Sequence, residues 1–152
     1  MIRLSKLADY AMLLMGHVAT HQERTHSALD LAEITQVPVP TVSKILTKLA
    51  RADILTSQRG ARGGYTLARS ARDISAADII GAVDGPIALT QCIEDGPGAC
   101  DLEMLCPSRI GWHRVNAAIL HALREVTLAE MASPWPAAFS QNAVGENRKG
   151  NR

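Results

Sequence analysis

The sequence contains no hydrophobic run long enough to cross a membrane. A spanning helix needs about 18 to 20 consecutive apolar residues, and none of the 152 residues lies in such a window. The opening stretch, MIRLSKLADYAML, also lacks the apolar block and small-residue cleavage site of a secretory signal. We therefore expect a cytoplasmic protein with no membrane partner.

Residue patterns for catalysis are missing as well. No glycine-rich phosphate loop stands between a strand and a helix, and the five histidines are scattered without a Ser/His/Asp grouping. We expect neither an enzyme nor a small-molecule substrate. Apolar residues at 47% and charged residues at 20% are near globular averages, which argues against a disordered chain.

The net charge of +1 conceals an uneven distribution. Residues 1–69 hold nine Lys/Arg against five Asp/Glu, residues 70–133 hold four against nine, and residues 134–152 hold three against one. Six cations between residues 40 and 69 face only one acid, Asp53. They are Lys44, Lys48, Arg51, Arg59, Arg62 and Arg69. A positive patch can therefore form on a nearly neutral protein.

The N-terminal part predicts three helices. Apolar residues at helical spacing indicate a first helix over residues 4–20. Ser27 and Asp30 resemble a capping box for a short second helix, which the prolines at 38–40 end. Pro40 suits the first position of a third helix with an apolar inner face. Two short helices joined by a tight turn predict a helix-turn-helix.

The outer face of the third predicted helix carries hydroxyls and cations. We expect Thr41, Ser43 and Lys44, near its N-terminal end, to reach base edges in the major groove. We expect Lys48 and Arg51 to contact phosphates. The alternative is an exposed face whose charges only make the protein soluble.

A basic hairpin follows this helix. Strand-like runs over residues 54–57 and 65–67 flank the segment RGARGG at residues 59–64, which predicts a wing with a flexible tip that approaches DNA closely. The residues expected at the DNA are Arg59, Arg62, Gly63, Gly64 and Tyr65. For Tyr65 the alternative is anchoring of the wing. Residues 1–70 thus predict a winged helix-turn-helix domain.

The remaining chain divides into four parts. Residues 71–87 predict a connecting segment, whose helix over 76–83 starts at a Ser75–Asp78 capping box. Residues 88–107 have no sustained period, which indicates a functional loop. Residues 108–133 predict the longest helix, and residues 134–152 predict a disordered tail. The fold class is mainly α, with a two-stranded β wing and a long C-terminal helix.

The long predicted helix has an apolar stripe that needs a partner. Its members are Trp112, Val115, Ile119, Leu123 and Val126. The stripe could pack on its own domain, but we favour a two-fold homodimer, because two recognition helices would then face a palindromic site.

All three cysteines, Cys92, Cys100 and Cys106, fall within fifteen residues with the spacing C-x7-C-x5-C. An odd number in a cytoplasmic chain argues against a disulfide framework. The spacing has no close CxxC pair, so zinc is not favoured. Three thiolates in a loop containing Gly and Pro suit an iron–sulfur cluster, and three reduced cysteines packed as small apolar residues are the alternative.

Five segments together resemble the Rrf2 family of bacterial transcription regulators. They are RLSKLADYAMLLMGHVA, VPVPTVSKILTKLARADIL, RGARGGYTLAR, the three cysteines and VTLAEMA. Within the family, SKLADYA, GPIALTQC and the W-x-x-V-N segment after Cys106 are most similar to regulators of SUF iron–sulfur-cluster assembly. The resemblance implies a winged helix-turn-helix, a homodimer with a long dimerisation helix, and a cluster held by the three cysteines.

The resemblance also bears on the fourth ligand. Relatives of the ISC type have a His three residues after the last Cys, where this chain has Arg109. In the nitric-oxide-sensing type an Asp in the first helix of the other subunit completes the site, and Asp9 matches its position. We expect Asp9, with four competitors: Glu94, Asp101, Glu103 and His113. Three thiolates and one carboxylate favour 2Fe–2S, with 4Fe–4S as the alternative.

These features predict a DNA-binding repressor of SUF genes that senses cluster status. One alternative is a nitric-oxide- or redox-sensing repressor of the same family. Another is an iron–sulfur carrier or scaffold, for which the basic hairpin would have no role.

Overall fold

The computed structural model describes residues 3–94, 100–101 and 103–132. The predicted tail at 134–152 and part of the predicted cysteine loop lie outside these ranges. The described elements are α1 (Lys6–Thr20), α2 (Ala28–Thr35), α3 (Val39–Arg51), β1 (Leu55–Gln58), β2 (Gly64–Leu67), α4 (Ala76–Asp84), α5 (Gln91–Glu94), the 3₁₀ turn η1 (Glu103–Leu105), α6 (Arg109–Glu125) and α7 (Leu128–Met131). The fold is mainly helical with one two-stranded antiparallel sheet, as predicted.

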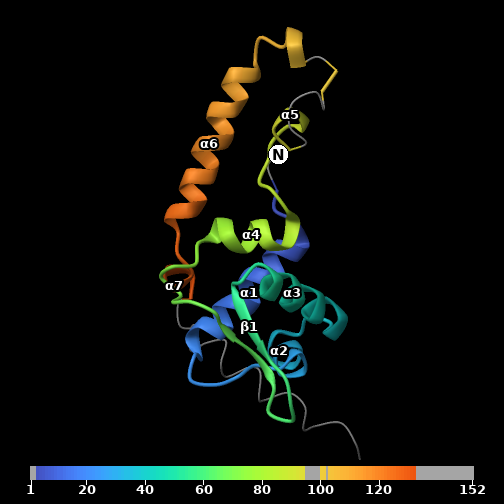
Figure 1. Cartoon of the computed structure of the whole chain (residues 1–152), viewed down its shortest axis with the longest axis vertical. Helices are drawn as coiled ribbons and strands as arrows, with labels where there is room; N and C mark the ends of the chain where they lie inside the picture. Colours follow the sequence, from blue (N-terminus) through green and yellow to red (C-terminus); the bar gives the residue numbers. More distant parts are fainter. Residues whose placement is uncertain (1–2, 95–99, 102, 133–152) are drawn as a thin grey trace, which may run out of the picture.

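Helices α1 to α4 and the hairpin form a body around one apolar core (Figure 1). Helix α3 contributes the stripe expected from its sequence: Val42, Ile45, Leu46 and Leu49 are all fully buried. Leu14 and Met15 of α1, and Ile79 of α4, meet them in the same core. The burial of this stripe fixes the rotation of α3, so that its polar side faces outward.

Local capping signals start most of the helices. The capping boxes predicted at Ser27–Asp30 and Ser75–Asp78 are both present. In α3, a proline stands in the first turn, where a missing N–H costs no helical hydrogen bond. The second helix ends slightly before the prolines, at Thr35, because Gln36 takes the left-handed conformation with φ 59°.

The hairpin has the predicted antiparallel arrangement, with Leu55 opposite Leu67 and Ser57 opposite Tyr65. A further short bridge pairs Tyr65 with His26, in the loop between α1 and α2, through N···O distances of 2.8 and 3.0 Å. The wing is therefore joined by backbone hydrogen bonds to the chain just before the helix-turn-helix.

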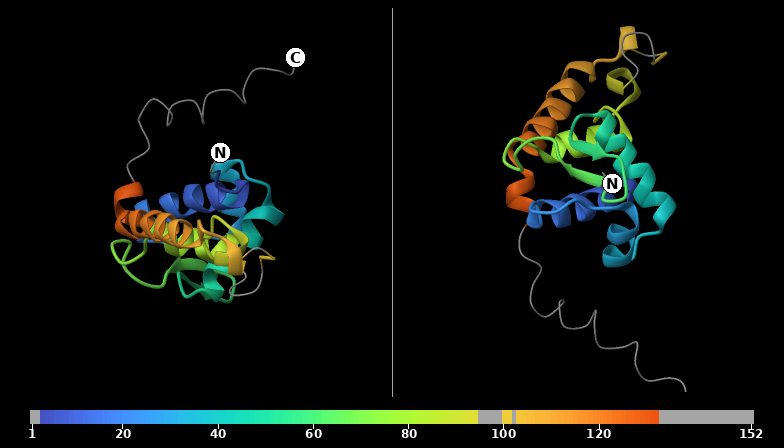
Figure 2. Two further views of the ribbon diagram at one scale, coloured as in Figure 1. Left: turned by 90° about the horizontal axis from the view of Figure 1, so that it is seen from above. Right: turned by 60° about the horizontal axis from the view of Figure 1, so that its bottom comes forward.

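An arm rises from the body at α4 (Figure 1). One side of the arm is α6, and the other is the segment that leaves α4 and reaches α5. We call the described residues 85–94, 100–101 and 103–125 the cysteine arm. At the lower end of α6, α7 lies beside α1, where Leu128 is fully buried (Figure 2). The arm is thus anchored in the body at both of its lower ends.

Two features of the C-terminal half differ from the sequence prediction. The long helix expected within residues 108–133 is two helices, because Val126 is extended and a Thr127–Glu130 capping box starts α7. The segment 88–107 contains α5 and η1, which are too short to show a helical period in the sequence. None of the described helices is long and apolar enough to span a bilayer.

Candidate DNA-binding surface and cysteine arm

The outer face of α3 presents most of the residues predicted to read DNA. Lys44 and Arg51 are exposed, whereas Thr41 and Ser43 are half-buried near the N-terminal end of the helix. The neighbouring Thr47 hydroxyl donates to the Ser43 carbonyl at 2.8 Å and stays on its own helix. The exposed N-terminal end and cationic flank have the arrangement that a recognition helix needs.

Lys48 differs from the other cations of α3. Its side chain is half-buried, and Nζ donates a hydrogen bond to the Val83 carbonyl of α4 at 2.5 Å. The Lys48 ammonium group therefore has a partner inside the protein.

The wing tip is basic and exposed. Arg59 and Arg62 both project into solvent at the turn, which the Gly63 N–H closes by donating to the Gly60 carbonyl at 2.9 Å. A Cβ atom at Gly63 would lie 2.4 Å from the Gln58 carbonyl oxygen. Glycine is therefore required here to close the hairpin, whose turn carries both arginines.

Gly64 and Tyr65 connect the wing to the body. A Cβ atom at Gly64 would lie 2.6 Å from the His26 carbonyl oxygen, so only glycine fits against this backbone. The Tyr65 ring is half-buried and packs on the core. The structure thus gives both residues an anchoring role, which for Tyr65 is the alternative interpretation of the sequence.

Arg69, the last cation of the basic segment, turns away from the patch. It lies 3.6 Å from the Asp78 carboxylate and donates to the Asp73 carbonyl at 3.1 Å. The positive surface that remains is formed by α3 and the wing tip.

The three cysteines are free thiols, all half-buried and all on the cysteine arm. Cys92 lies on α5, with its sulfur 3.2 Å from the Thr90 hydroxyl, and Cys106 stands just before α6. Among the residues that the structure describes, no three Cys, His, Asp or Glu side chains are grouped closely enough to hold a metal ion. Thiols are the donors that iron–sulfur clusters use, but this conformation does not gather them.

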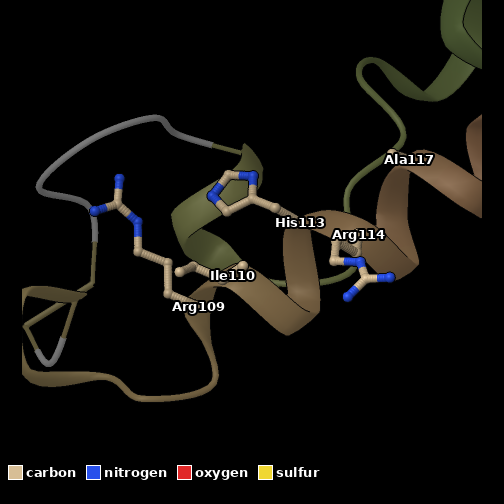
Figure 3. Close-up of a pocket in the computed structure, with 5 residues that line it drawn as sticks. All are labelled: Arg109, Ile110, His113, Arg114 and Ala117. Carbon is tan, nitrogen blue, oxygen red and sulfur yellow. The ribbon is translucent and has the colours of Figure 1, made fainter.

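The predicted fourth ligands are dispersed. Asp9 is exposed on the first turn of α1, and Asp101 is exposed on the arm. The side chains of Glu94 and Glu103 lie outside the described part of the structure. His113 is exposed on α6, where it lines an open hollow of about 480 Å³ (Figure 3). The other lining residues are Arg109, Ile110, Arg114 and Ala117.

The last residue of the W-x-x-V-N segment holds the arm together, a role that the sequence does not predict. Asn116 of α6 is only 8% exposed; its amide nitrogen donates to the Ile87 carbonyl, and its amide oxygen accepts from the Leu89 N–H, each at 3.1 Å. The available signal was one amide side chain directly after Val115 of the apolar stripe. Asn116 therefore fastens the segment leading to Cys92 onto α6.

A helix-turn-helix followed by an anchored basic hairpin defines a winged-helix DNA-binding protein. The chain belongs to the Rrf2 family, described as iron-dependent transcriptional regulators, whose pattern it matches over residues 4–134. It is therefore a DNA-binding transcriptional regulator and not an enzyme.

Individual relatives agree with this assignment. The transcriptional regulator IscR of Vibrio vulnificus is 30% identical over 133 residues, which cover 87% of this chain and 78% of that protein. The structure of CymR, the global cysteine regulator of B. subtilis, matches with a TM-score of 0.66 and 27% identity over 87% of this chain and 97% of that one. T. potens IscR matches with a TM-score of 0.65 and 25% identity over 91% and 96%.

Proposed function

We propose that this protein is a cytoplasmic, homodimeric repressor of SUF iron–sulfur-cluster assembly genes that senses cluster status. The observation that carries the proposal is the position of the thiols. All three cysteines lie on one arm, and that arm is joined through α4 to α3, the predicted recognition helix. The description of the family as iron-dependent supports cluster status as the signal that is sensed.

The proposed cofactor is a 2Fe–2S cluster held by Cys92, Cys100, Cys106 and Asp9. Cysteine thiolates suit such a cluster, and its presence would make the protein responsive to iron supply and oxidation. We propose that Asp9 comes from the second copy, as the family resemblance implies. Repression with the cluster present, and release when it is lost, is the direction expected from that resemblance.

The first experiment on the cluster is an anaerobic visible spectrum with iron and sulfide quantification, on wild type beside Cys100→Ala. A coloured wild type with the content of a 2Fe–2S cluster, and a colourless variant, support the proposal. Iron and sulfide contents that match a 4Fe–4S cluster would change the proposed cluster type from 2Fe–2S to 4Fe–4S. A wild type that stays colourless after reconstitution would leave only DNA binding in place, with the cysteines as thiol switches or structural residues.

The exposed side of α6 supports a dimer. Trp112 and Val115 are each 44% exposed on this helix, although Leu123 at its lower end packs on the core. An apolar helix face of this kind is buried by a second copy in two-fold dimers. Sedimentation velocity should give a dimer for wild type and a monomer for Val115→Glu. A monomeric wild type at micromolar concentration contradicts this part of the proposal.

DNA binding itself is tested by its salt dependence. Contacts with phosphate predict that the logarithm of the affinity falls linearly with the logarithm of the salt concentration. Arg62→Ala at the wing tip should lower this slope by about 0.9. Binding of operator DNA that is the same with and without the cluster would exclude cluster sensing. Release of DNA by stoichiometric nitric oxide instead would favour the nitric-oxide-sensing alternative.

A further inference from the structure

Lys48 is the one predicted DNA contact on α3 whose cation the structure turns inward to another element. Lys44, one helical turn earlier, is exposed, whereas the Nζ atom of Lys48 donates to the Val83 carbonyl at 2.5 Å. The Lys48 side chain therefore connects the predicted recognition helix to the last turn of α4.

The acceptor is well suited to a cation. Val83 stands in the last turn of α4, where carbonyls lack the N–H of a following helical turn. Three residues later stands Pro86, which has no N–H to offer. The C-terminal end of a helix also carries partial negative charge, so an ammonium group there is favourable.

The same end of α4 is joined to α1. The Ser5 hydroxyl donates to the Asp84 carboxylate at 2.7 Å, and Ser5 also caps α1 by accepting from the Ala8 N–H at 3.0 Å. Asp84 of α4 thus binds the start of α1, the helix that carries Asp9. The preceding residue, Val83, binds Lys48 of α3.

The cysteine arm begins at this point. The chain turns at Gly85, with φ 93°, and runs to Ile87 and Leu89, which Asn116 binds from α6. Cys92 follows on α5. A continuous path of contacts therefore leads from the first cysteine of the arm to the recognition helix through the Lys48–Val83 hydrogen bond.

We propose that Lys48 is a positioning residue that fixes the recognition helix against the base of the cysteine arm, and that it does not neutralise a DNA phosphate. Movement of residues 83–89 would then change the seating of α3 through this contact. This inference rests on the proposed function in one respect, because cluster status is the signal that would move the arm. The Lys48–Val83 hydrogen bond itself does not depend on a cluster.

The first test compares Lys48→Met with Arg51→Met, a loss of the same charge about one turn away on the same helix, at an exposed residue that is expected to contact phosphate. The probe is a mixed-sequence DNA duplex, for which binding depends on phosphate contacts. We expect Arg51→Met to lower the salt slope by about 0.9 and Lys48→Met to leave it unchanged. An equal reduction by Lys48→Met would show that Lys48 binds phosphate, and would overturn the proposal.

The second test follows hydrogen exchange at the base of the arm in the full-length protein. The Gly85 N–H donates to the Gly81 carbonyl and the Leu89 N–H to Asn116. Loss of the Lys48 contact should speed exchange at both amides about tenfold, whereas Lys48→Arg, which keeps a cationic donor, should change it little. Unchanged exchange in Lys48→Met would also overturn the proposal.

The two tests separate the failure of this inference from that of the proposed function. If wild type binds no DNA, the proposed function fails and the exchange experiment alone decides the role of Lys48. If Lys48→Met does not fold, Lys48→Gln, which keeps a hydrogen-bond donor but has no charge, decides instead. An unchanged salt slope in that variant supports a positioning contact, and a slope lowered by about 0.9 contradicts it.

Discussion

A hydrogen bond of 3.1 Å joins the Asn116 side chain of α6 to the Leu89 backbone on the opposite side of the cysteine arm. The Asn116 amide oxygen accepts from the Leu89 N–H while its nitrogen donates to the Ile87 carbonyl, so one side chain satisfies a donor and an acceptor of the backbone. The segment before Cys92 thereby lies along α6 without forming a strand or a helix of its own.

Replacing Asn116 should therefore loosen the arm. In Asn116→Ala two half-buried backbone groups lose their partners, which we expect to cost about 1 to 3 kcal/mol of unfolding free energy in urea denaturation. The matched control is His121→Ala on the same helix, because the ion pair of His121 with Glu125 is exposed and should contribute less than about 0.5 kcal/mol. Equal effects of the two substitutions would contradict the role given to Asn116.

Gly64 should tolerate no side chain. In Gly64→Ala the new methyl group would collide with the His26 backbone at 2.6 Å, so we expect a loss of about 1 to 3 kcal/mol in stability and a weaker bridge to the wing. In Gly16→Ala the methyl group meets nothing within 4 Å on helix α1, so a gain of about 0.5 to 1 kcal/mol is expected. Thermal melting of both variants measures the difference, and a neutral Gly64→Ala would rule out the close approach.

Stability should fall in mild acid because of the histidines at the end of α1. Burial first, and then the positive neighbours His21, His26 and Arg24, lower the pKa of His17 from 6.5 to about 4. Burial also lowers the pKa of His26, although its hydrogen bond with the His21 carbonyl opposes this shift. Because the unfolded chain binds these protons more readily, the stabilisation is complete above about pH 6.5 and is lost as the pH falls toward 4.

Urea midpoints at about pH 7.5 and about pH 5 test this expectation. Wild type should lose up to about 1 kcal/mol between them through His17, since solvent screens part of the effect at this partly exposed ring, and His17→Gln, which cannot bind the proton, should lose less. The exposed His121→Gln serves as the matched control and should keep the wild-type difference. A wild type whose stability is equal at the two pH values would show that burial does not lower the pKa of these histidines.

The attachment of α6 should depend on one leucine. Leu128 of α7 is fully buried, and its N–H donates to the Ile74 carbonyl at 2.7 Å. Leu128→Ala should therefore cost about 2 to 5 kcal/mol, whereas Leu29→Ala, at a leucine that is 68% exposed, should cost less than about 1 kcal/mol. Chemical denaturation distinguishes them, and a mild effect at Leu128 would mean that α7 is not part of the core.

Much of the body could be predicted from the sequence because its signals are local. The capping boxes at Ser27 and Ser75 need only the residue three positions later, and the apolar stripe of α3 follows from helical spacing. The hairpin follows from two short strand-like runs around glycines. These elements were predicted with boundaries close to those observed.

The cysteine arm could be predicted less well because local signals are weak there. Its α5 and η1 are single turns without a period, and the break at Val126 depends on the docking of α7 into the core. The cysteines and Asp9 were chosen by residue type and family resemblance. Their assembly into one site stays a prediction, because it depends on contacts that residue type does not encode.

Local signals along the chain are enough to predict a winged helix-turn-helix regulator with a thiol-bearing segment, since helix starts, apolar stripes and turns depend on residues that are close in sequence. Which cations face solvent depends on packing between elements that are distant in sequence. Lys44 and Lys48 are of the same type on the same helix, yet one is exposed and the other binds the Val83 carbonyl. That difference arises because α4 brings a carbonyl from a distant part of the chain within reach of Lys48 alone.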